Sequence, residues 1–149
     1  MTSTEQSISC LNALLRGELA ATETYQQAIA KMEGTKDESD LRQIHDEHRE
    51  VANALRQHIH ECGGQPDQGS GAWGTWSKFV EGTAKLFGTA AALKALKKGE
   101  EQGVKDYRKA AKDGGLSSES KGMINNEFLP KTFEHIAVLD RLIASSKKK

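Results

Sequence analysis

Apolar residues recur at steps of three and four along four segments of the chain, the spacing of one face of an α-helix. The four segments run from about Thr4 to Glu33, Glu38 to Cys62, Leu86 to Lys112 and Ser117 to Ser145. Glycines follow the first three segments, at Gly34, Gly63-Gly64 and Gly114-Gly115, where helices commonly end. The pattern predicts an all-α protein with four long helices.

The connections between these segments predict how the helices pair. Residues 34–37 form a short loop, so the first two helices should be antiparallel neighbours. The connection before the third helix is long: Gln65 to Gly74 is rich in Gly, Pro, Ser and Asp, and Trp73 and Trp76 should then cap one end of the core. Two helical hairpins with a long middle connection are the plan of a ferritin-like four-helix bundle, here as a single domain over residues 1–149.

The last segment contains two local signals. Ser117 followed by Ser120 is typical of a helix N-cap. Pro130 removes one backbone hydrogen bond inside the segment and should kink or split this helix.

Four polar side chains interrupt the apolar stripes, one in each predicted helix. They are Glu18, His48, Glu100 and His135. A buried carboxylate without a partner costs roughly several kcal/mol or becomes protonated. A metal ion, a histidine, a tyrosine hydroxyl or another polar group must therefore satisfy the carboxylates. Counting from the loops places all four groups near the middle of the bundle.

The two halves of the chain repeat this pattern. Gly17-Glu18 with Tyr25 recurs as Gly99-Glu100 with Tyr107, seven residues after each Glu, and Glu47-His48 recurs as Glu134-His135. The repeat predicts pseudo-twofold symmetry, with the two tyrosines donating to the carboxylates and orienting them.

Two carboxylates and two imidazoles around one core form a candidate site for iron, manganese or zinc, and the glutamates beside the histidines add possible ligands. The candidate ligands are Glu18, His48, Glu100, His135, Glu47 and Glu134. The alternative is a metal-free hydrogen-bond network of the same Glu, His and Tyr side chains. The Glu-x-x-His motif of ferritin-like di-iron proteins is absent, since Glu47-x-x-Glu50 and Glu134-x-x-Ala137 stand in its place.

Charge and composition exclude some functions. With 21 basic and 21 acidic residues the net charge is zero, which argues against nucleic acid as a partner. No apolar run approaches the ~18 residues of a membrane helix, and the first residues do not read as a signal peptide. We therefore expect a cytoplasmic protein without a membrane partner, forming a homo-oligomer, most simply a dimer.

The two cysteines do not form a disulfide framework. Cys10 begins the first helix and Cys62 ends the second, so an antiparallel hairpin would place them at similar height. His58, His60 and Cys62 are either additional ligands or part of an exposed helix end, and His58 and Cys62 are one helical turn apart.

Three stretches carry a resemblance to a known family: LNALLRGELAATETYQQAI, EHREVANALRQHIHECGGQP and ALKALKKGEEQGVKDYRKA. Over roughly residues 8 to 112 the chain resembles a bacterial family of ferritin-like four-helix-bundle proteins catalogued as a domain of unknown function. The resemblance implies the fold and leaves the activity open, so no catalytic residue follows from it. By fold-level analogy it implies a metal-binding bundle with a stress- or redox-related role. The alternative is a structural or protein-interaction bundle.

Overall fold

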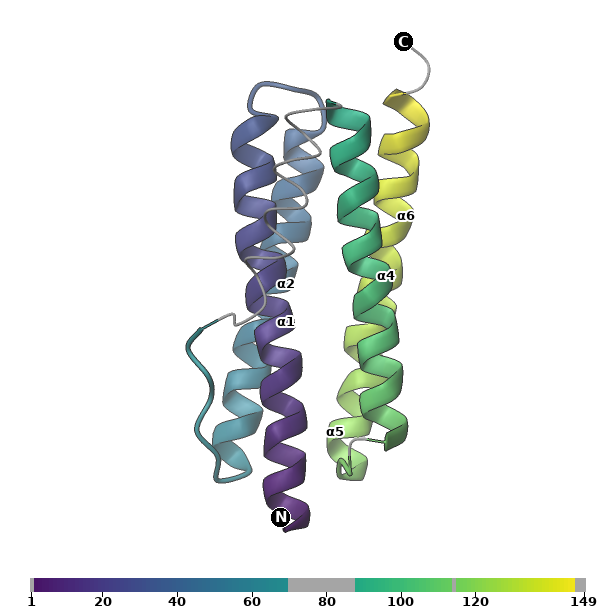
Figure 1. The fold of residues 1–149 in the computed structure, drawn as a ribbon. Helices are drawn as coiled ribbons and strands as arrows, with labels where there is room; N and C mark the ends of the chain where they lie inside the picture. Colours follow the sequence, from purple (N-terminus) through teal and green to yellow (C-terminus); the bar gives the residue numbers. More distant parts are fainter. Residues whose placement is uncertain (1, 70–87, 114, 147–149) are drawn as a thin grey trace.

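The computed structural model describes residues 2–69, 88–113 and 115–146, and every regular element in these ranges is helical. The elements are α1 (Ser3–Lys31), α2 (Glu38–Glu61), α4 (Thr89–Asp113), α5 (Ser118–Met123), the π-helical turn η1 (Ile124–Phe128) and α6 (Leu129–Ser146). Their axes lie side by side along the length of the molecule and form a four-helix bundle, in which α5, η1 and α6 together make up the last helix (Figure 1). Trp73, Trp76 and Leu86 lie outside the described residues.

The bundle consists of two pairs of helices, α1 with α2 and α4 with α6, each packed more closely within itself than against the other (Figure 1). Helix α1 starts at a reciprocal cap, in which the Thr2 hydroxyl accepts from the Glu5 amide and the Glu5 carboxylate accepts from the Thr2 amide. The turn after α1 requires Gly34, whose φ of 82° is unfavourable for residues with a Cβ. The first helix therefore ends at Lys31, two residues before the predicted end.

The last helix contains the predicted N-cap at Ser117 and an interruption before Pro130. The Ser117 hydroxyl accepts from the Ser120 amide, which confirms the N-cap. Pro130 follows a π-helical turn, in which the Leu129 amide donates to the Ile124 carbonyl five residues earlier. A wider turn adds one residue to the helix and shifts its phase, so the predicted interruption takes the form of a π turn and the chain stays helical on both sides.

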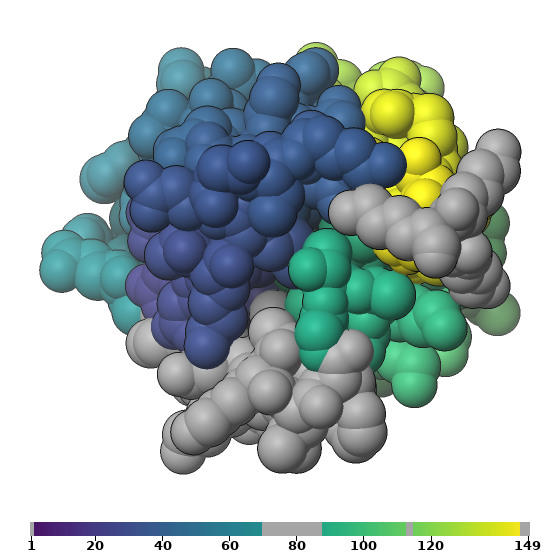
Figure 2. Space-filling view, turned by 90° about the horizontal axis from the view of Figure 1, so that it is seen from above, coloured from purple at the N-terminus to yellow at the C-terminus, as the bar shows by residue number. Residues whose placement is uncertain are grey.

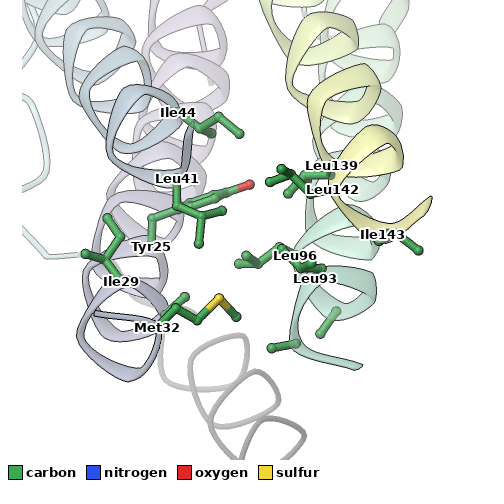
Figure 3. Packing of buried hydrophobic residues seen from close by; sticks show 13 residues of the cluster. Tyr25, Ile29, Met32, Leu41, Ile44, Leu93, Leu96, Leu139, Leu142 and Ile143 are labelled. Carbon is green, nitrogen blue, oxygen red and sulfur yellow. The ribbon is translucent and has the colours of Figure 1, made fainter. Parts of the chain in front are cut away.

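Two apolar clusters fill the core on either side of the polar residues near the middle of the bundle. One cluster lies toward the α1–α2 turn, where Tyr25, Leu41, Leu96 and Leu139 are among its fully buried members. Figure 3 shows this cluster, with the Tyr25 ring extending from α1 across the core toward the opposite helix pair. The other cluster is formed by Leu11, Leu14, Leu15, Val51, Ala52, Leu55, Ile59, Tyr107, Ala110, Leu116, Ile124 and Phe128.

At one end of the bundle, the α1–α2 turn lies beside the start of α4 and the end of α6 (Figure 2). Here the Lys36 ammonium donates to the Ser145 hydroxyl at 3.3 Å, which links the two helix pairs. Among the described residues, no helix is long and apolar enough to cross a membrane.

Candidate metal centre

The four polar residues that interrupt the apolar stripes meet between the two apolar clusters. Their exposed fractions are 6% for Glu18, 5% for His48, 1% for Glu100 and 2% for His135. Charged groups buried this deeply need partners, because the surrounding apolar side chains cannot replace water. Each partner is supplied by a different helix, so the network links all four helices.

His48 lies at the centre of the network, between two carboxylates. Its Nδ1 is 2.5 Å from Glu18 Oε2 and its Nε2 is 2.7 Å from Glu100 Oε2. A ring that donates to two carboxylates carries both protons and is a cation. Burial by itself would lower the pKa of His48, but the negative charges of Glu100 and Glu18 outweigh it and raise the pKa well above 6.5.

His135 extends the network toward the surface. Its Nδ1 is 3.2 Å from Glu100 Oε1, and its Nε2 is 2.9 Å from Oε1 of Glu47, whose side chain is 23% exposed. The rings of His48 and His135 lie beside each other with centroids 4.7 Å apart. Both histidines therefore place both ring nitrogens against carboxylate oxygens, and Glu100 is shared between them.

The two tyrosines connect the halves of the repeat crosswise. The Tyr25 hydroxyl on α1 donates to Glu100 Oε2 on α4 at 2.7 Å, and the Tyr107 hydroxyl on α4 donates to Glu18 Oε1 on α1 at 2.5 Å. Burial, with the neighbouring carboxylates adding to it, raises the pKa of both tyrosines well above 10.0, so both remain neutral donors. The repeat predicted tyrosines that orient the carboxylates, and each donates to the glutamate of the other half.

The pKa of Glu100 reflects the competition between burial and its neighbours. Burial favours the neutral acid, but the charge of His48 and the hydrogen bonds from His135 and His48 outweigh it and hold the pKa far below 4.5. Glu100 is therefore a carboxylate, with contacts to His48, His135 and Tyr25.

The pseudo-twofold symmetry is broken at the glutamates beside the histidines. Glu47 turns inward and pairs with His135, whereas Glu134 is exposed and lies outside the network. On the last helix His135 faces the core, whereas Glu134, one position earlier, faces solvent. The structure thus brings together five of the six predicted ligands and leaves Glu134 on the surface.

The donor set fits a transition metal ion. One ligand atom from each of His48, Glu100 and His135 lies within 4.8 Å of the other two, and all three residues are buried. Imidazole nitrogens with carboxylate oxygens suit zinc, iron and manganese. The remaining carboxylates, Glu18 and Glu47, are each hydrogen-bonded to one of the histidines, which is how outer groups commonly fix metal-ligating imidazoles.

The sequence of this chain matches a family model described as a domain of unknown function, DUF2383, over residues 6–113. The chain belongs to this family. No curated protein and no solved structure matches it. The family match spans the helices that carry Glu18, His48 and Glu100 and ends before His135. The DUF2383 region therefore contains most of the polar centre, and the last helix adds the second histidine.

In this DUF2383 protein a cavity of about 450 Å³ between α1 and α4 reaches the polar centre. Glu18, Glu100 and Tyr107 line it together with small residues of both helices. A Cβ built at Gly17 would meet no atom within 4 Å, so the wall is open at this point. The cavity stays unfilled because its lining on α1 and α4 includes the small residues Ala13, Gly17, Ala20, Ala21, Ala95, Gly99 and Gly103.

Sequence reasoning missed the surroundings of His58. An exposed helix end was one of the two interpretations, but His58 is buried, with 5% of its surface exposed, and its Nε2 is 2.6 Å from the Ser120 hydroxyl. The Cys62 sulfur lies 3.9 Å from the same nitrogen. The stripe spacing in α2 gives no sign of Ser120, because that contact depends on how α5 packs against α2. Cys10 and Cys62 are free thiols.

Proposed function

We propose that this protein binds a divalent transition metal ion in the bundle core, with His48, Glu100 and His135 as ligands. One observation carries the proposal: three buried ligand atoms from three helices converge within 4.8 Å. Burying a cluster of charged groups costs free energy unless the charges balance. In the metal-free protein the ring protons of the histidines balance the carboxylates, and a divalent cation would take over that role.

Glu18 and Glu47 would then act as further ligands or as hydrogen-bond partners of the histidines. Tyr25 would hold Glu100 and Tyr107 would hold Glu18, each through a neutral hydroxyl that donates to the carboxylate. The cavity between α1 and α4 offers the ion a path to Glu18 and Glu100. Glu134 is left out of the proposed ligand set because its side chain is exposed.

The ferritin-like relationship and the stress- or redox-related role expected from the sequence belong to this proposal. Iron or manganese in the centre would supply redox chemistry, whereas zinc does not change its oxidation state. The identity of the bound metal therefore decides whether the redox role holds.

The test is metal analysis of purified protein, followed by chelator treatment and addition of Fe(II) without oxygen, Mn(II) or Zn(II). The variants are Glu100→Gln, which keeps the side-chain shape, and Glu101→Gln as a control on the exposed face of the same helix. We expect the wild type and the control to melt at higher temperature with metal; a concentration 100 times the Kd stabilises by about 2.7 kcal/mol. Glu100→Gln should show a smaller shift than both, because it lacks a ligand of the core centre. Equal shifts in all three proteins, or none in the wild type, would disprove binding at this centre.

A metal-free hydrogen-bond network is the second candidate. The observation in its favour is that every ring nitrogen of His48 and His135 and both tyrosine hydroxyls already have a carboxylate partner. Such a network would fix the register of the four helices in a structural or interaction protein. It predicts that the core holds no metal, so added metal shifts the melting temperatures of the wild type and Glu100→Gln equally.

A further inference from the structure

A second group of metal-ligating side chains lies away from the core centre, where the last turn of α2 meets the first turn of α5. His58 and Glu61 come from α2 and Glu119 comes from α5, and one ligand atom from each lies within 4.8 Å of the others. The three-residue spacing of His58 and Glu61 places both side chains on the same face of the helix. The group therefore joins the first helix pair to the second.

The imidazole in this group is held in place. His58 is buried and its Nε2 is 2.6 Å from the hydroxyl of Ser120, whose backbone amide donates to the capping Ser117 hydroxyl. The residue next to Ser120 is Glu119, so the cap that starts α5 places the Glu119 backbone close to His58. A ring fixed by a hydroxyl on the neighbouring element is the usual setting of a metal-ligating histidine.

The two carboxylates face the imidazole without a counter-charge. Glu61 and Glu119 are exposed, and among the described residues neither has a hydrogen bond or an ion pair. Their oxygens lie within 4.8 Å of each other, where like charges repel. A cation at this point would remove the repulsion and use all three donors.

We propose that His58, Glu61 and Glu119 bind Zn²⁺ and that the ion ties the end of α2 to the start of α5. One nitrogen and two carboxylate oxygens suit zinc better than calcium or magnesium, which take oxygen ligands. The fourth position of a tetrahedral zinc site is open to water. This site is independent of the core centre.

The experiment separates the two sites by working in Glu100→Gln protein, which lacks the shared carboxylate of the core. Zinc chloride is titrated into chelator-treated protein by calorimetry, and melting is measured with and without zinc. The test variant adds Glu61→Gln and Glu119→Gln; because both residues are exposed, the fold is not at risk. The control adds Glu33→Gln and Glu127→Gln, which make the same change in charge at exposed positions elsewhere.

We expect one zinc ion per chain and a raised melting temperature in the Glu100→Gln protein and in the control. The test variant should bind zinc more weakly by at least about 100-fold, the upper limit for loss of a mere outer-shell partner, and should lose the melting shift. Zinc binding of equal strength in the test variant and the control would overturn the proposal, as would no zinc binding by the Glu100→Gln protein. Failure of the core site leaves this outcome unchanged, because that site is disabled in every protein compared.

Discussion

Replacing Glu100 with leucine should strongly destabilise the metal-free protein. The side chain is 1% exposed, and its two oxygens accept from the Tyr25 hydroxyl, His48 Nε2 and His135 Nδ1. Leucine fills similar space but accepts no hydrogen bond. The change leaves three buried donors without their acceptor, and the positive charge of His48 is then balanced by Glu18 alone.

The magnitude follows from the kind of contact that is lost. Removing one partner of a buried ion pair costs about 3–5 kcal/mol, because the other charge remains buried and uncompensated. For a chain of this size that loss lowers Tm by about 6–20 °C. Glu101→Leu is the matched control, since Glu101 is the next residue on the same helix and is exposed. Its effect should stay within about 0.5 kcal/mol of zero.

The assay is urea unfolding of chelator-treated proteins, followed by helical circular dichroism. A lower midpoint with an unchanged slope would report lost stability rather than a change in the unfolded state. If Glu100→Leu unfolds within about 1 kcal/mol of Glu101→Leu, the polar network contributes little to stability and the reasoning fails. A result of about 3–5 kcal/mol supports the network in the metal-free protein and leaves metal binding to the metal titration.

Three smaller predictions test the network and the thiols. Tyr25→Phe keeps the ring and removes one hydroxyl donor to a carboxylate, so it should cost about 1.5–3 kcal/mol in urea unfolding; no loss would show that the hydroxyl is unimportant. In the metal-free protein Glu100 has a lowered pKa, so its contribution is present above pH 4.5 and lost at lower pH, whereas His48 has a raised pKa, so its contribution is present below pH 6.5 and lost as pH rises through the raised value. These two groups therefore stabilise the fold most between pH 4.5 and 6.5, and unfolding midpoints that show no decline on either side would contradict this. Burial raises the pKa of Cys10 above 9.0, so in Cys62→Ala protein its alkylation at neutral pH should be slower in the native state than in urea; equal rates would refute the shift.

The helix pattern made much of the fold predictable. The buried members of each stripe, such as Leu11, Leu55, Leu96 and Leu142, face the core as the three- and four-residue steps require. Interruptions of these stripes by Glu18 and Glu100 were informative because a carboxylate at a core position needs a partner whichever helix supplies it.

The site was harder to predict, because its contacts join helices that are distant in sequence. The repeat indicated a symmetric set, yet Glu47 pairs with His135 while Glu134 is exposed. Nothing in the local sequence distinguishes these two glutamates, since each precedes a buried histidine. Which one turns inward depends on the rotation of α2 and α6 about their axes, and a small difference in rotation moves a side chain at the edge of the stripe from core to solvent.

The sequence by itself determined that the chain forms long amphipathic helices and that two carboxylates and two imidazoles lie among their apolar faces, because the periodicity of apolar residues is a property of each helix alone. Only the tertiary structure decided which oxygen faces which nitrogen, that each tyrosine donates to the glutamate of the other half, and that His58 meets Glu119 across the helix pairs. Those contacts depend on the relative height and rotation of separate helices, which packing of the whole core sets.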